Sequence, residues 1–220
     1  MKKTIFSAKH IPANLFVAML YMFVILFLVS CKKDSSAFIV KLDHADVHIE
    51  DPKMQPPSGE NTLLWNNRGH VPIMAPDGHH ITLGEFNKPT GYAEIDCKRQ
   101  GTSVKVHVKG LIPNGVYTIW VLTFKSPGFE PTFANLIGNG ALGAADGSMN
   151  KFTASSHGTA TLSATMPAGP LSLFGSVTDC LFSEYEVHMV AAYHLDFVTH
   201  GGMPGPPNTW VAQFVFQFHQ

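Results

Sequence analysis

The chain contains little charge, little cysteine and no excess of basic residues. Charged residues make up 14% of its 220 residues, and 15 lysines and arginines stand against 16 acidic residues. Proteins that bind a nucleic-acid backbone rely on an excess of positive charge, so we expect no nucleic acid as a partner. The hydrophobic share of 45% is nevertheless ample for a core, which excludes a wholly disordered chain.

The sequence motifs of common enzyme classes are also missing. The chain contains no Gly-x-Ser-x-Gly, no phosphate-binding Walker loop and no dinucleotide-binding glycine pattern. We therefore expect a non-enzymatic binding or assembly module whose ligand is an unknown protein or small molecule. A hydrolase with an unrecognised site in a loop is kept as an alternative.

The first thirty residues are typical of a secretion signal. Lys2 and Lys3 open the chain, and an uncharged apolar run extends from Leu15 to Val29. That run is shorter than the ~20 residues of a membrane-spanning helix, so a cleaved signal is favoured over a permanent span. The run ends in Leu28-Val29-Ser30-Cys31.

Leu28-Val29-Ser30-Cys31 resembles the lipobox of bacterial lipoproteins. In that family the cysteine is diacylated, the signal is cut just before it, and the new amino terminus is acylated. The resemblance implies that residues 1–30 are removed and that lipid on Cys31 anchors the protein to a membrane. In Gram-negative lipoproteins, an Asp directly after the lipidated cysteine resembles an inner-membrane retention signal. In this chain the residue after Cys31 is Lys32. This difference implies the outer membrane of the cell envelope, with the periplasmic or surface face left open.

The cleaved chain would be mildly acidic and would keep two further cysteines. Removing residues 1–30 removes three lysines and no acid, which leaves 12 basic and 16 acidic side chains and a formal charge of −4. The compartment beyond the inner membrane is oxidising, so Cys97 and Cys180 are expected to form a disulfide. The alternative is two buried free thiols.

Alternation of apolar and polar residues predicts strands through most of the chain. We expect residues 31–61 to contain the lipidated cysteine, a tether and early strands, and residues 62–220 to form one domain. That domain is predicted to be an all-β sandwich, Ig-like or jelly-roll, of about 7–9 strands, with a closed barrel as the alternative. The expected strands include 80–86, 92–98, 104–109, 116–124, 159–165, 184–189 and 210–218. The last strand is expected to place Trp210, Ala212, Phe214, Phe216 and Phe218 on one face.

Two long stretches rich in glycine and proline interrupt this pattern, at residues 126–156 and 201–208. Binding residues gather on loops held by a rigid scaffold, so these are the candidate functional surfaces. A shorter connection, Gly110-Leu111-Ile112-Pro113-Asn114-Gly115-Val116-Tyr117-Thr118, resembles the Gly-Leu-x-Pro-x-x-x-Tyr hairpin of secreted bacterial β-sandwich modules. The resemblance implies the fold and no activity.

Histidine is unusually frequent, with 12 in the chain. Neutral imidazole is a common ligand of copper and zinc, so these histidines suggest a metal-binding envelope protein as a second hypothesis. His194 and His200 are the expected partners, because a turn between them would bring them together. His79, His80 and Met203 are further candidate ligands. The alternative is that these histidines lie on the surface and bond to the backbone.

Overall fold

The structure is a computed structural model of the whole chain. It describes residues 36–41, 43–44, 59–66, 68–98, 101–124, 135–167, 169–170, 176–177 and 186–218. The chain divides into two units, residues 1–34 and 35–220, and every described residue belongs to the second. The predicted signal, the lipidation site Cys31 and the Cys97–Cys180 disulfide lie outside the described residues, the last because Cys180 does.

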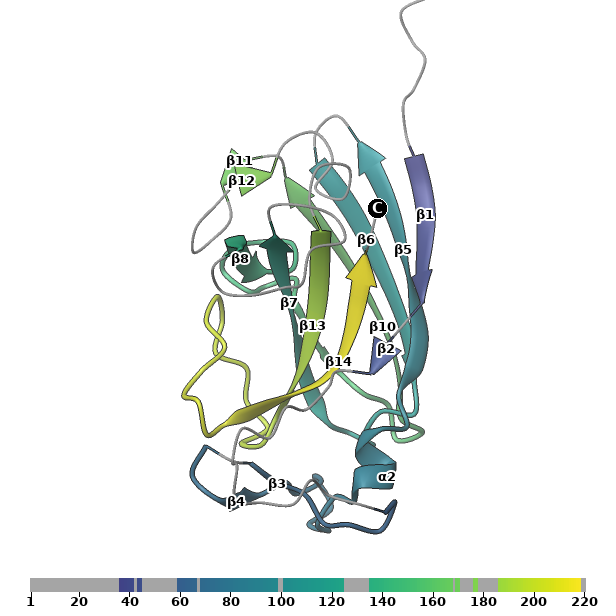
Figure 1. Cartoon of the computed structure of the whole chain (residues 1–220), viewed down its shortest axis with the longest axis vertical. Helices are drawn as coiled ribbons and strands as arrows, with labels where there is room; N and C mark the ends of the chain where they lie inside the picture. Colours follow the sequence, from purple (N-terminus) through teal and green to yellow (C-terminus); the bar gives the residue numbers. More distant parts are fainter. Residues whose placement is uncertain are drawn as a thin grey trace, which may run out of the picture. The chain divides into compact units, whose positions relative to one another are not determined.

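Most described strands belong to two antiparallel sheets (Figure 1). The first has the order β1-β5-β6-β10, with the bounds β1 Ser36–Lys41, β5 Thr90–Lys98, β6 Gly101–Lys109 and β10 Thr159–Pro167. The second has the order β2-β14-β13-β7-β8, and β9 also pairs with β7. Its bounds are β2 Asp43–His44, β7 Val116–Phe124, β8 Leu136–Ala141, β9 Lys151–Thr153, β13 Glu186–His194 and β14 Trp210–Phe218.

Three small elements complete the described fold. Two short ribbons pair β3 (Trp65–Asn66) with β4 (Val71–Pro72) and β11 (Gly169–Pro170) with β12 (Ser176–Val177). The helix α2 spans Leu83–Phe86. Among the described residues, no helix is both long and apolar enough to cross a membrane.

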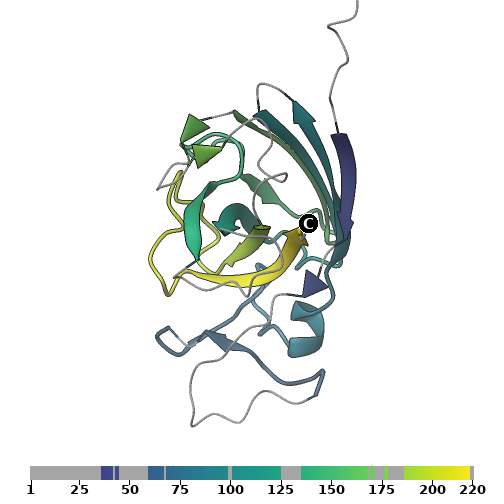
Figure 2. The same cartoon turned by 45° about the horizontal axis from the view of Figure 1, so that its top comes forward.

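The inward faces of the two sheets form one hydrophobic core. Figures 1 and 2 show the two sheets from two directions. Val104, Val106 and Val108 are buried on β6, and Tyr117 and Ile119 are buried on β7. The predicted all-β sandwich is therefore confirmed. Within the described residues the two sheets contain ten strands. Two of them, β1 and β2, come from residues 31–61, where early strands were expected, and the other eight agree with the 7–9 predicted for residues 62–220. The stretch expected to be one long loop, however, contains β8 and β9.

The connection between β6 and β7 is a crossover between the sheets, so the predicted hairpin is wrong. The two strands belong to different sheets, and the chain turns through Asn114, whose φ is 56°. The hydroxyl of buried Tyr117 accepts the Ile112 N–H at 3.0 Å, and burial raises the pKa of Tyr117. A buried tyrosine tied to the backbone just upstream is a recurring corner in such sandwiches, which explains the Gly-Leu-x-Pro-x-x-x-Tyr pattern.

The strand predicted at 80–86 is also wrong, because capping chemistry outweighs the apolar alternation there. The Thr82 side chain accepts the Glu85 N–H at 3.3 Å, and Glu85 Oε2 accepts the Thr82 N–H at 2.9 Å. This reciprocal capping box satisfies two donors at the start of a helix and favours the single turn of α2.

A β-bulge in the last strand, β14, reverses the alternation of its side chains between the two faces of the sheet. Phe214 pairs with Ala191 and Ala212 pairs with Ala192, which leaves Gln213 as an extra residue. Phe214 therefore lies in the core, whereas Trp210 lies opposite His194 on the outer face. The prediction that Trp210 and Ala212 share a face with Phe214, Phe216 and Phe218 is wrong, because the extra residue reverses the alternation.

Candidate metal centre

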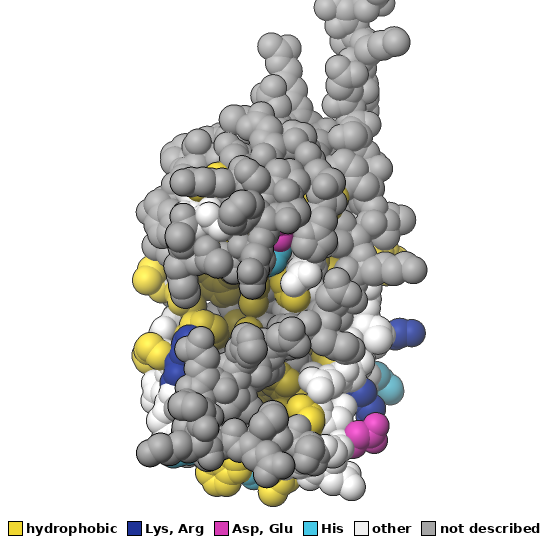
Figure 3. Space-filling model, in the orientation of Figure 1, with side chains coloured by type: hydrophobic (Ala, Val, Ile, Leu, Met, Phe, Trp, Pro, Cys, Tyr) yellow, Lys and Arg dark blue, Asp and Glu magenta, His cyan; other side chains and the backbone are white. Residues whose placement is uncertain are grey.

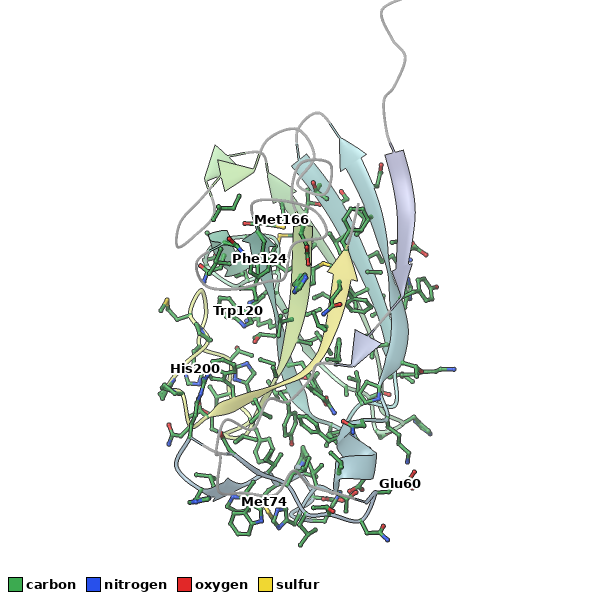
Figure 4. All side chains as sticks on the ribbon, viewed as in Figure 1. Glu60, Met74, Trp120, Phe124, Met166 and His200 are labelled. Atoms are coloured by element: carbon green, nitrogen blue, oxygen red, sulfur yellow. The ribbon has the colours of Figure 1, made fainter. Side chains whose placement is uncertain are left out.

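Three side chains with metal-binding atoms meet where β13 ends. One ring nitrogen of His194, one of His200 and one carboxylate oxygen of Asp196 all lie within 4.8 Å of one another. A turn follows the strand, in which the Phe197 N–H bonds to the His194 carbonyl at 3.3 Å. The expected turn therefore brings the two predicted histidines together. Figure 4 shows His200 on the loop that leaves β13.

His194 is the buried member of the cluster, with 0% of its surface exposed. It follows Tyr193, which faces the core, so His194 points to the opposite face of the sheet. Its Nε2 lies 2.8 Å from Oγ1 of Thr118 on β7. Its Nδ1 is also buried and has no hydrogen-bond partner in the part of the chain that the structure describes. A buried polar atom without a partner costs about 1–3 kcal/mol, and a bound ion or water at Nδ1 would offset that cost.

Asp196 and His200 form the more exposed side of the cluster. His200 Nε2 lies 3.0 Å from Asp196 Oδ2, and the other carboxylate oxygen accepts the Val198 N–H at 3.2 Å. The rings of His194 and His200 are 5.9 Å apart between centroids and tilted by 38°. The loop thus holds the Asp196 carboxylate beside the His200 ring and within 4.8 Å of a ring nitrogen of His194.

Two glycines allow the loop to pack around His200. A Cβ atom on Gly147 would overlap the carbonyl oxygen of Gly201, so the 144–147 turn can touch this loop only with glycine there. A Cβ on Gly205 would lie 2.7 Å from Nε2 of His200 and closer still to Cδ2. Gly205 also has a φ of 90°, which favours glycine. The His200 ring therefore occupies space that a side chain at position 205 would fill.

Burial keeps His194 neutral at physiological pH. Desolvation lowers the pKa of His194 from its ordinary value of 6.5, the charge of Asp196 opposes this shift, and His200 adds to it. Metal ions bind the unprotonated nitrogen of a neutral imidazole. The electrostatic state of His194 therefore suits a ligand.

The loop that carries the cluster also exposes hydrophobic side chains. Phe197, Val198 and Met203 are 39%, 54% and 55% exposed. Figure 3 shows hydrophobic side chains reaching the surface on the face in view. The cluster thus lies between a buried strand end and an exposed, partly apolar loop.

The other candidate ligands make different contacts. His79 bonds through Nδ1 to Asp77 at 2.6 Å and through Nε2 to Glu85 at 3.1 Å. His80 Nε2 lies 2.6 Å from the Leu64 carbonyl oxygen. These two histidines are not members of the cluster.

Met203 lies in the turn that follows His200, where its N–H bonds to the His200 carbonyl at 3.3 Å. The sequence analysis did not include Asp196 among the candidate ligands. Its position in the short segment between His194 and His200 was the signal that could have identified it. Thr118, which is remote in sequence, was also missed.

The cluster offers the donor set of a transition-metal site and could hold a metal ion. Two imidazoles and one carboxylate suit zinc and copper. Two ligand atoms at ~2.1 Å in tetrahedral directions stand ~3.4 Å apart, so the three atoms need to approach by at most about 1.4 Å. Asp196 is the exposed member of the cluster, so its side chain has the most room to move.

No family model matches the chain, and neither a curated protein nor a solved structure matches it. A fold by itself does not imply a function, so the role of the site is inferred from its own residues.

Proposed function

We propose that this protein binds a zinc or copper ion through His194, Asp196 and His200 and is anchored in the bacterial cell envelope by lipid on Cys31. The observation that carries the metal site is the buried Nδ1 of His194, which has no hydrogen-bond partner among the described residues. One nitrogen of the same ring lies within 4.8 Å of a ring nitrogen of His200 and of a carboxylate oxygen of Asp196. A bond to a metal ion would satisfy Nδ1.

Metal binding would also change the bond between His200 and Asp196. In the structure these two side chains lie within hydrogen-bonding distance, at 3.0 Å. Both would bond to the ion instead, and three protein ligands would leave one position of a tetrahedral site open for water or a further ligand.

The lipid anchor is supported by the sequence around Cys31. The lipobox-like tetrapeptide at the end of an uncharged run supports an envelope location, and Lys32 favours the outer membrane. An envelope location fits the metal proposal, because the bound ion would meet compounds from outside the cytoplasm.

Metal analysis of the full-length protein in detergent tests the proposal. After chelation and dialysis, wild-type protein titrated with Zn²⁺ or Cu²⁺ should bind one ion per chain with high affinity. His194→Ala and His200→Ala should each lose that ion, because two protein ligands rarely hold zinc.

His79→Ala is the matched control, since His79 also lies two residues from an aspartate and contacts a second side chain. It should bind metal like the wild type. Equal metal binding by His194→Ala and wild type would contradict the proposal. Ester or glycoside turnover that depends on the bound metal would show instead that the open position serves a hydrolase.

A further inference from the structure

Thr118 links the buried histidine of the cluster to a tryptophan. Thr118 is buried on β7, and its Oγ1 accepts the indole N–H of Trp120 at 2.8 Å. The same oxygen lies 2.8 Å from Nε2 of His194. β7 and β13 are adjacent strands, and Thr118 pairs with Ala192, two residues before His194. The three side chains therefore lie on the outer face of the sheet. Trp120 is labelled in Figure 4.

A count of hydrogens determines how these three side chains are hydrogen-bonded in the metal-free protein. An indole N–H can only donate, whereas a hydroxyl has one hydrogen and two lone pairs. Trp120 uses one lone pair of Thr118, and His194 Nε2 is the only other hydrogen-bond contact of that hydroxyl among the described residues. If Nε2 carried the histidine proton, the buried Thr118 O–H would have no acceptor. The hydroxyl therefore donates to Nε2, and the proton of neutral His194 lies on Nδ1.

Metal binding requires the opposite arrangement, in which the Thr118 O–H has no acceptor among the described residues, so the metal–nitrogen bond has to offset that cost. Nε2 is occupied by Thr118, so the ion has to bind Nδ1, and a metal binds only an unprotonated nitrogen. The Nδ1–H bond breaks, an Nε2–H bond forms by exchange with water, and the metal–Nδ1 bond replaces the lost proton. His194 is neutral before and after, so this exchange releases no net proton from the ring.

We propose that Thr118 is the positioning residue of the metal site, because its hydroxyl donates to His194 in the metal-free protein and accepts from His194 when the metal is bound. This inference rests on the proposed metal-binding function. A hydroxyl can reverse its hydrogen bond in this way, whereas a carbonyl can only accept and an ammonium can only donate. The Trp120 N–H occupies one lone pair of the Thr118 oxygen with and without the metal. It thereby restricts the directions in which the Thr118 O–H can point.

The loss of such a partner of a metal-binding histidine typically costs 10–100-fold in metal affinity. Thr118→Val keeps the shape of the side chain and removes the hydroxyl, so its affinity for Zn²⁺ should fall by about 10–100-fold. Thr118→Ser keeps the hydroxyl and should retain most of the affinity. Thr123→Val is the matched control, because Thr123 is a buried threonine of the same strand whose hydroxyl donates to the Gly138 carbonyl at 2.9 Å. It should bind Zn²⁺ like the wild type.

The experiment combines Zn²⁺ titration with ¹⁵N NMR of the histidine rings, both on the full-length protein in detergent. The metal-free wild type should show His194 with its proton on Nδ1, and saturation with Zn²⁺ should move the proton to Nε2. Near-ultraviolet circular dichroism confirms that each variant is folded before its affinity is compared.

The outcomes separate this inference from the proposed function. A wild type that binds Zn²⁺ together with a Thr118→Val variant that binds it equally tightly would overturn the role of Thr118 alone. A metal-free spectrum with the proton on Nε2 would overturn the reversal of the hydrogen bond. A wild type that binds neither Zn²⁺ nor Cu²⁺ would overturn the proposed function and, with it, the role of Thr118.

Discussion

Two histidines of this protein lie beside carboxylates and are nevertheless in opposite situations. His79 is 43% exposed, and each of its ring nitrogens bonds to a carboxylate, of Asp77 and of Glu85. His194 is buried, bonds through one nitrogen to a threonine, and has a second nitrogen without a partner among the described residues. A carboxylate nearby therefore does not define a metal site. What distinguishes the two is a buried nitrogen that remains available.

The same contrast appears in their protonation. Burial acts to lower the pKa of His79, but the hydrogen bonds and charges of Asp77 and Glu85 outweigh it and raise that pKa above 6.5. At His194 burial prevails and lowers the pKa. His79 is thus suited to hold a proton between two carboxylates, and His194 is suited to bind a metal ion.

The largest expected difference between the two is in metal-dependent stability. A ligand present at 100 times its dissociation constant stabilises the folded state by ~2.7 kcal/mol. Zn²⁺ at that excess should raise the free energy of unfolding of the wild type and of His79→Ala by this amount, and should leave His194→Ala unchanged. Chemical denaturation followed by fluorescence measures it, and an equal gain in all three proteins would contradict the assignment of the site.

A pair of glycine substitutions tests the position of His200. Gly78 and Gly205 have the same φ of 90°, so an added side chain strains both backbones alike. A Cβ on Gly78 meets nothing within 4 Å, whereas one on Gly205 would strike the ring of His200. Loss of a contact that orients a metal ligand typically costs ~10–100-fold in metal affinity. Gly205→Ala should weaken Zn²⁺ binding by about that factor, and Gly78→Ala should not change it. Similar affinities in titrations of the two variants would show that the His200 ring is free to move.

The order of protonation gives a smaller but direct test. As pH falls, the His79 ring should take up its proton above pH 6.5 and the His194 ring below it, because their pKa values shift in opposite directions. Histidine resonances of the metal-free protein, followed by NMR between pH 8 and pH 5, report both transitions. The reverse order would contradict the burial of His194.

The smallest expected effect is on stability as a function of pH. The pKa of His79 is raised on folding, so its contribution is present below pH 6.5 and is lost as pH rises through the folded pKa. The pKa of His194 is lowered, so stability falls as pH drops from 6.5 through the folded pKa. Solvent screens the exposed His79 pair, and its effect should therefore be slight. In chemical denaturation without metal, the free energy of unfolding of the wild type should fall slightly above pH 6.5 as the His79 pair is lost. His79→Gln should not show this fall. An unchanged pH profile would exclude a role for the His79 pair in stability.

Local periodicity predicted much of this fold. The alternating valines of β6 and the β-branched and aromatic run of β7 indicated a half-buried sheet, and the structure confirms both strands. Errors arose where one residue outweighed the pattern. Gln213 reverses the faces of β14 as a bulge, and Thr82 caps a helix within an apolar alternation.

The candidate site was predictable only in part, for a similar reason. His194 and His200 were recognised because a short turn joins them. Thr118 is 76 residues from His194, and only the pairing of β7 with β13 brings it there. Which nitrogen of His194 is free depends on that pairing, so the sequence alone could not reveal it. Lipidation of Cys31 stays a prediction, because it lies outside the described residues.

A crystal structure of the Zn²⁺-loaded protein, with anomalous diffraction recorded at the zinc edge, tests the central claim most directly. We predict one anomalous peak about 2.0–2.2 Å from Nδ1 of His194, from a ring nitrogen of His200 and from a carboxylate oxygen of Asp196. Zinc bound elsewhere, with Nδ1 of His194 uncoordinated, would contradict it.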